Sequence, residues 1–333
     1  MLRKILTFFQ KETVLSISAI LAILSMFIVH PSGKYFSYID FRTLSLLFCL
    51  MSIVAGLSEI GLFDYLAEKI LSRANSIKSI IVLLVLLCFF FSMIITNDVA
   101  LITFVPFAII ILKKMSEKQK NYWILRTVVM QTIAANLGSM LTPIGNPQNL
   151  YLYSKSGMGV GEFLILMLPY TVLAAVLLFV TIVLRKKQPL HTLQIASEVS
   201  FKNYRKQVIY AVLFVQCLLC VAQILPAWFV TIVTVFVVFF TDRDTLKVID
   251  YSLLLTFAGF FIFIGNMGRI PAFCDFLKGI ISGNEILTAV ASSQVISNVP
   301  AALLLSGFSG DLKQLLLGVN LGGLGTLIAS MAS

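Results

Sequence analysis

Long apolar runs are the feature of this sequence that most restricts its fold. A helix needs roughly 20 apolar residues to cross about 30 Å of hydrocarbon, and the chain reaches or approaches that length repeatedly. Hydrophobic residues make up 59% of the 333 and charged residues only 12%, about half of the roughly 25% typical of soluble domains. A soluble core could not bury so much apolar surface. The sequence therefore predicts an all-α polytopic membrane protein whose partner is the lipid bilayer, and excludes an ordinary soluble enzyme and a disordered chain. Uninterrupted spans are expected near 13–30, 43–61, 163–184, 207–224, 227–241 and 251–268.

Three other apolar runs, 77–112, 122–157 and 285–333, are broken near their middle by polar or helix-breaking residues. Irregular backbone at membrane depth is tolerated only where it is buried in protein or lines a wet cavity. We therefore expect two re-entrant helical hairpins, within 77–112 and 285–308, and two broken transmembrane helices.

The basic residues orient the chain. The net charge is +10, but Lys and Arg form short clusters between apolar runs rather than one basic face, so no nucleic-acid partner is expected. With a cytoplasmic N-terminus, 19 of the 25 basic residues fall on the cytoplasmic side and six on the other. This bias follows the positive-inside rule. It predicts a multi-pass protein of the plasma or inner membrane with its N-terminus in the cytoplasm.

An internal repeat organises the chain. Residues 40–70 align without a gap on 250–280, and two later blocks recur in the same order. Because 43–61 and 251–268 are expected to run in opposite directions, the repeat is inverted, which is typical of secondary transporters. The predicted parts are an N-terminal helix (1–39), a first repeat (40–184), a linker with two connecting helices (185–249) and a second repeat (250–333) that by symmetry lacks its last helix. The matched blocks are Asp40 with Asp250, Thr96-Asn97 with Ser297-Asn298, Asn136-Leu137-Gly138 with Asn320-Leu321-Gly322, and Thr142 with Thr326.

The first break is Thr96-Asn97-Asp98, in which Asp98 is the only acid deep inside an apolar stretch. A charge there costs at least about 2.5–3.5 kcal/mol, so it needs a partner or a wet cavity. One interpretation is a cation or proton site. The other is a helix N-cap, with Asn97 or Asp98 capping the helix that follows. The two are compatible, because a capped helix end also directs backbone N–H groups at a ligand.

The second break runs from Thr142 to Asn149 and contains two prolines and Gly145. Prolines four residues apart exclude a regular helix. The unwound carbonyls, together with the Asn146 and Asn149 amides, suit a small cation such as Na⁺, and the alternative is an ordinary loop.

The second repeat has its own breaks. Ser297-Asn298-Val299 repeats the first break but has Val299 in place of Asp98. Gly322 to Thr326, with Gly325 between them, is a flexible break free of proline, and its alternative reading is close glycine-mediated helix packing.

No enzyme chemistry is indicated. The sequence has no P-loop, and its two histidines, His30 and His191, lie at a helix end and in the linker, so no Ser–His pair is expected. Cys217 and Cys220 have no second pair or nearby His to complete a metal site. We expect no cofactor other than the coupling ion. A passive channel is disfavoured because two hairpins that meet at mid-membrane would block a continuous pore.

The segments TNDVALITFVPF, ANLGSMLTPIGNPQN and SSQVISNVPAALLL resemble the ion transporter superfamily. The nearest branch is the arsenite permease and NhaD-like sodium–proton antiporter group, which is grouped with citrate-transporter-like and SLC13-type permeases. The resemblance covers about residues 40–333. It implies a homodimer in which the Asn and Thr of each hairpin tip contact a substrate carboxylate. It also implies that each tip and the adjacent unwound loop hold Na⁺.

Carried onto this chain, the resemblance implies two half-sites, with Na⁺ at Asn97, Gly145 and Asn146. The sequence departs from the family pattern where Asp98 and Val299 replace the two threonines, and an extra carboxylate disfavours an anion unless a proton or cation neutralises it. The expected function is ion-coupled transport of a small anion, an oxyanion or a carboxylate, by symport or antiport. The alternative is Na⁺/H⁺ antiport through Asp98. The half-sites are Thr96, Asn97 and Asp98 with Thr142, Gly145, Asn146 and Asn149, and Ser297, Asn298 and Val299 with Gly322, Gly325 and Thr326.

Overall fold

The computed structural model describes residues 12–72, 74, 76–113, 117–183, 204–326 and 329–330. Within these ranges the only regular elements are helices, which confirms the all-α fold. Most of the expected basic linker, 185–203, and the last residues of the second repeat, 331–333, lie outside the described residues. The helices are α2 (Thr13–Ile28), α3 (Tyr35–Tyr38), α4 (Phe41–Glu59), α5 (Leu62–Leu71), α6 (Ile77–Ile95), α7 (Asn97–Leu112), α8 (Glu117–Ser139), α9 (Pro147–Ser156), α10 (Val160–Val183), α11 (Tyr204–Val221), α12 (Ala227–Thr241), α13 (Thr245–Val248), α14 (Tyr251–Met267), α15 (Pro271–Ile281), α16 (Glu285–Ile296), α17 (Asn298–Ser306) and α18 (Leu312–Leu321).

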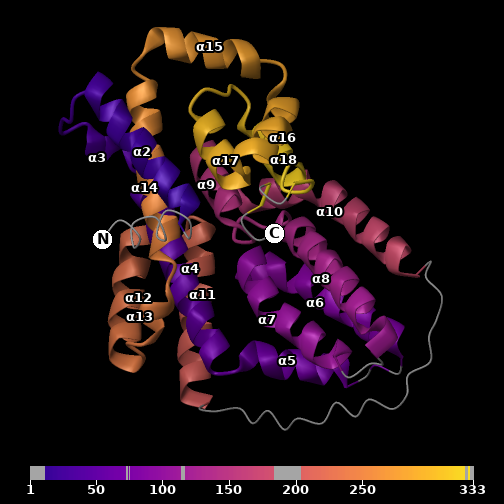
Figure 1. Cartoon of the computed structure of the whole chain (residues 1–333). Helices are drawn as coiled ribbons and strands as arrows, with labels where there is room; N and C mark the ends of the chain where they lie inside the picture. The colour runs from indigo at the N-terminus through magenta and orange to yellow at the C-terminus, as the bar shows by residue number, and fades with distance from the viewer. Residues whose placement is uncertain are drawn as a thin grey trace, which may run out of the picture.

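Helices lie at all six expected uninterrupted spans. Four described helices are long and apolar enough to cross a membrane alone, and they are α4, α10, α11 and most of α6. Helix α14 bends by 107° into α15, so α15 leaves the direction of the span. In Figure 1, α15 lies across one end of the molecule and α5 across the other. We call these two ends the α15 end and the α5 end.

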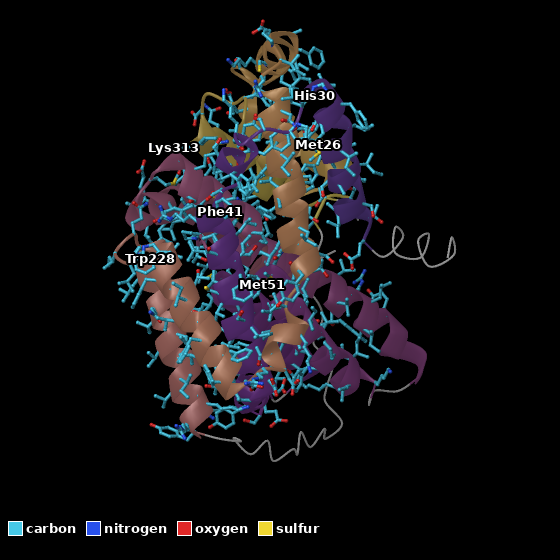
Figure 2. All side chains as sticks on the ribbon, turned by 90° about the vertical axis from the view of Figure 1, so that its left-hand side faces the viewer. Met26, His30, Phe41, Met51, Trp228 and Lys313 are labelled. Atoms are coloured by element: carbon cyan, nitrogen blue, oxygen red, sulfur yellow. The ribbon has the colours of Figure 1, made fainter. Side chains whose placement is uncertain are left out.

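Helices α4 and α14 start in the same way. Asp40 accepts a hydrogen bond from the backbone N–H of Thr43, and Asp250 accepts one from that of Leu253, so each aspartate caps its helix. A short helix, α3 or α13, precedes each of them. Helix α2, which precedes α3, lies along α14 of the second repeat. Helix α12, which precedes α13, lies along α4 of the first repeat. Figure 2 shows this crossed packing, with Met26 marking α2, Met51 marking α4 and Trp228 the start of α12.

Two helical hairpins enter from opposite ends and meet near the middle of the molecule (Figure 1). The first is α6 and α7, joined at Thr96, and the second is α16 and α17, joined at Ser297. Both joining residues have backbone angles rare outside glycine, φ 74° and ψ 151° at Thr96 and φ 75° and ψ 156° at Ser297. The residue that follows each joining residue donates a backbone hydrogen bond to a later segment of the chain. The Asn97 N–H donates to the Gly145 carbonyl at 3.1 Å, and the Asn298 N–H to that of Ala329 at 2.9 Å.

The first broken helix is α8 followed by α9, with an unwound segment at 140–146. Asn149 holds that segment together, because its Nδ2 lies 3.2 Å from the Ser139 and Thr142 carbonyl oxygens. Gly145 packs so closely that a Cβ there would lie 2.0 Å from the Ser139 carbonyl oxygen. Glycine is therefore required at this position for its size.

Candidate substrate and ion site

A cavity of about 600 Å³ lies beside the first hairpin tip. Its walls are α4 from Leu47 to Glu59, the tip and first turns of α7, the start of α9, and the chain from Asp244 to Leu253. Met51, labelled in Figure 2, lies about half-way along the molecule and lines it. Because Glu59 ends α4 and Asp244 precedes α13, the cavity extends toward the α5 end.

The ionisable residues that line this cavity are all acidic: Glu59, Asp98, Asp244 and Asp250. Among the described residues, no Lys, Arg or His lines it. Three of the four have a partner: Glu59 accepts from the Thr245 hydroxyl at 3.3 Å, Asp244 pairs with a lysine at 2.7 Å, and Asp250 accepts from the Leu253 N–H at 2.9 Å. A cavity lined by one sign of charge raises the local concentration of ions of the opposite sign. This cavity therefore favours cations.

Asp98 differs from the other three because it lies at the hairpin tip, near the middle of the molecule. Its Oδ1 atom is buried and has no hydrogen-bond partner among the described residues. An ionised carboxylate in such a place carries a large desolvation cost unless a proton or a cation neutralises it. The part of the chain that the structure describes thus supplies a cavity beside the carboxylate but no group that neutralises it.

A second, much smaller cavity of about 10 Å³ lies between the two hairpin tips, which is about the space of one water molecule. Asn97 and Asp98 line it from the first tip, and Asn298 and Val299 from the second. Asn97 is 4% exposed, and its amide nitrogen donates to Asn136 at 3.1 Å. Its Oδ1 has no partner among the described residues. The structure therefore brings both predicted tips together around unpaired oxygens.

Three buried asparagines connect the repeats beneath this point. Asn320 of α18 donates to Asn149 Oδ1 at 2.6 Å and accepts from Asn146 at 3.2 Å. Asn146 also caps α9 by accepting from the Asn149 N–H at 2.9 Å. The amides predicted to bind a cation are thus already hydrogen-bonded to each other, although Asn146 also lines the larger cavity.

The two predicted threonines brace the unwound segments in equivalent ways. Thr142 donates its hydroxyl to the Met93 carbonyl, and Thr326 donates to that of Gln294. Each acceptor lies three residues before its hairpin tip. The two threonines that match in the sequence therefore make equivalent hydrogen bonds.

Gln294 occupies the second half-site, and sequence reasoning missed it. Its amide nitrogen donates to the Gly322 carbonyl at 2.6 Å and to that of Leu324 at 2.9 Å, and its oxygen accepts from the Thr326 N–H at 3.0 Å. Gly325 has φ 133° beside this side chain. The equivalent residue of the first repeat is Met93, which is apolar, so comparing the repeats did not indicate this role.

The predicted site residues therefore divide into two groups. Six line one of the two cavities, and Ser297 joins the helices of the second hairpin beside them; the six are Thr96, Asn97, Asp98, Asn146, Asn298 and Val299. The others, which line neither cavity, support the unwound segments: Thr142, Gly145, Asn149, Gly322, Gly325 and Thr326.

Toward the α15 end, side chains of α9, α14 and α17 pack on one another. Tyr151 of α9 meets the Ser306 hydroxyl of α17 at 2.8 Å, and its ring packs 5.5 Å from that of Phe261. Lys155 Nζ lies 3.2 Å from the Tyr151 hydroxyl. The large cavity lies toward the α5 end instead.

Comparisons with known proteins agree with this architecture. A family model described as citrate transporter matches residues 5–328. The chain is 34% identical over 321 residues to the uncharacterized transporter MJ0456 of Methanocaldococcus jannaschii, covering 96% of this chain and 86% of that protein. It is 31% identical over 315 residues to the inner membrane protein YbiR of Escherichia coli, covering 93% of this chain and 82% of that protein. The chain therefore belongs to the citrate transporter family, in agreement with its resemblance to the ion transporter superfamily, and is a polytopic membrane transporter rather than an enzyme.

Proposed function

We propose that this protein is an ion-coupled secondary active transporter in which Asp98 binds the coupling cation, H⁺ or Na⁺. The observation that carries the proposal is the buried, unpartnered Oδ1 of Asp98 at the tip of the first hairpin. The same residue lines both the large cavity and the small one between the tips. An ion that neutralises Asp98 removes its desolvation cost, so ion binding and the conformation of the tip are linked.

The proposed substrate is a small anion, a carboxylate or an oxyanion, that binds between the tips. The description of the matching family as citrate transporter supports a carboxylate. Asn97 and Asn298 present amides to the small cavity, and each begins a helix whose N-terminus favours negative charge. A cation on Asp98 would offset the repulsion between that carboxylate and the substrate.

Na⁺/H⁺ exchange is the second candidate, and the acidic lining of the large cavity favours it. Under this alternative no anion is needed, and Na⁺ and H⁺ compete for Asp98. Both candidates place the cavity on the cytoplasmic face, because the α5 end is the side on which the basic residues predict cytoplasm. The membrane itself would be the plasma or inner membrane.

Transport by purified protein in liposomes with a trapped pH dye tests the proposal and separates the candidates. Citrate and other carboxylates and oxyanions are added outside, with and without a Na⁺ gradient. We expect cation-dependent uptake of one of these anions, and its loss in Asp98→Asn. Asp275→Asn is the matched control, because it removes an exposed carboxylate from α15, far from the cavity.

Two outcomes would change the conclusion. Na⁺-driven proton flux that needs no anion, and that Asp98→Asn abolishes, would establish exchange instead. Wild-type cation dependence in Asp98→Asn would show that another group binds the coupling ion, and the proposal would be wrong.

A further inference from the structure

The aspartates that cap the equivalent helices α4 and α14 differ in one respect. Thr43 Oγ1 donates a hydrogen bond to Asp40 Oδ2, while the Thr43 N–H binds Oδ1. Both oxygens of Asp40 are therefore satisfied within its own helix turn. The equivalent of Thr43 in the second repeat is Leu253, which offers only its backbone N–H to Asp250 Oδ1. Among the described residues, no hydrogen-bond donor reaches the second oxygen of Asp250.

Asp250 is an exposed residue that lines the same cavity as Asp98. Asp40 lies at the other end of α4 from Glu59 and is not among the described residues that line this cavity. The repeat equivalent of Asp98 is Val299. The two repeats thus differ at Asp98 of α7 and at Leu253 of α14. Both differences add carboxylate oxygens to the same cavity.

Unpaired oxygens at Asp98 and its neighbour Asn97 point to a cation rather than to a structural role. Asn97 Oδ1 has no partner although the residue is only 4% exposed, and Asn97 and Asp98 line the small cavity with Leu253. Carboxylate and amide oxygens without a basic neighbour are the ligand set of small, hard cations. Two carboxylates that line one cavity repel each other, and a proton or a cation bound between them would remove that repulsion.

We propose that Asp250 is the second carboxylate of the coupling-cation site, so that Asp98 and Asp250 bind one H⁺ or Na⁺ together. Leu253 keeps Asp250 available for this role by offering no side-chain hydrogen bond. The inference rests on the proposed function of Asp98 and adds the group that completes its site. It also predicts that the matching residues of the first repeat, Asp40 and Thr43, have no part in cation binding.

The test measures cation binding to the full-length protein in detergent, without any transported solute. Thermal unfolding is followed while NaCl replaces choline chloride at constant ionic strength, and the series is repeated across pH. Four variants are compared with wild type: Asp250→Asn, Leu253→Thr, Asp40→Asn and Thr43→Val. Asparagine caps helices as well as aspartate does, so both Asn variants keep the cap. Leu253→Thr retains the carboxylate but supplies the hydroxyl that occupies its equivalent in the first repeat.

We expect a saturable stabilisation by Na⁺ that is absent in Asp98→Asn. In Asp250→Asn and Leu253→Thr the Na⁺ concentration for half-saturation should rise at least tenfold, whereas Asp40→Asn and Thr43→Val should match wild type. If the ion is H⁺, Na⁺ has no effect and the same two variants shift the pH dependence of stability instead.

The outcomes separate this inference from the proposed function. Wild-type responses in both Asp250→Asn and Leu253→Thr, with Asp98→Asn inactive, would overturn the role of Asp250 and leave that of Asp98 intact. A wild-type response in Asp98→Asn would overturn both. A wild-type protein that responds to neither Na⁺ nor pH would also overturn both, because no cation site would then exist.

Discussion

Glycine should stabilise this protein more than alanine does at either hairpin tip, the reverse of its effect inside a helix. Thr96 and Ser297 have φ 74° and 75° with ψ 151° and 156°, at the border of a region that is essentially restricted to glycine. A Cβ atom at such angles collides with the neighbouring peptide. The strain persists because backbone hydrogen bonds from Asn97 and Asn298 fix the residues that follow.

The magnitude follows from two opposing terms. Strain in this region costs about 1–3 kcal/mol per residue, and glycine removes it. Glycine also loses more backbone entropy on folding, which costs about 0.5–1 kcal/mol relative to alanine. At each tip glycine should therefore equal alanine or exceed it by up to about 2.5 kcal/mol. Inside a helix the same exchange costs about 1 kcal/mol. Ala175→Gly in α10 provides that reference.

The assay compares Thr96→Gly with Thr96→Ala, and Ser297→Gly with Ser297→Ala, by unfolding the detergent-solubilised protein. Comparing glycine with alanine cancels the loss of the side chain, which matters at Ser297 because its hydroxyl lies 3.3 Å from Asn298 Oδ1. If glycine is less stable than alanine at both tips by as much as at Ala175, the tips are not strained. The reasoning would then be refuted.

Two further changes test the packing that positions the site. Asn320→Ala leaves the buried Asn149 Oδ1 without its donor and removes one of the two acceptors of Asn146 Nδ2. It should therefore cost about 1–3 kcal/mol in thermal unfolding, whereas Asn284→Ala, at an exposed position, should cost little. A loss below about 1 kcal/mol would mean that water replaces the missing amide. Gly138→Ala places a Cβ 2.0 Å from the Phe89 carbonyl oxygen and should destabilise by about 1–3 kcal/mol or more. Gly279→Ala, with open space around it, should be neutral or slightly stabilising, and equal effects of the two would contradict the close contact of α6 and α8.

Helix positions followed from the sequence because the membrane imposes one simple rule on apolar length. The expected span 227–241 and the helix Ala227–Thr241 coincide, and the others agree within a few residues. The hairpin tips were also predictable, because Asn97 and Asn298 interrupt otherwise apolar runs at equivalent points. Local composition decides these features, so no knowledge of distant contacts was required.

The chemistry around the tips depends on distant contacts, and the sequence could not supply it. Asn149 was expected to offer an oxygen to a cation, but its nitrogen binds the carbonyls of the unwound segment. An amide contains both a donor and an acceptor, and only the folded geometry decides which one faces a loop. The presence of Asp250 and Asp98 in the lining of one cavity was equally hidden. A signal did exist, since the match of Asp40 with Asp250 fails three residues later, where Thr43 faces Leu253.

The departures from internal symmetry all place acidic oxygens at one cavity, and this has a consequence for coupling. Glu59 faces the cavity where the second repeat has Arg269, and Asp98 stands where the second repeat has Val299. Asp250 has a free oxygen where Asp40 has none. An inverted repeat alone gives two equivalent conformations, one open at each end, with equal affinity for any ion. A ligand shifts such an equilibrium only by its difference in affinity between the two states. Asp98 lies on a hairpin and Asp250 on α14, so any motion of the hairpin along α14 separates the two carboxylates. We therefore expect the cation to bind more tightly when the cavity is open at the α5 end, and that difference is what coupling requires.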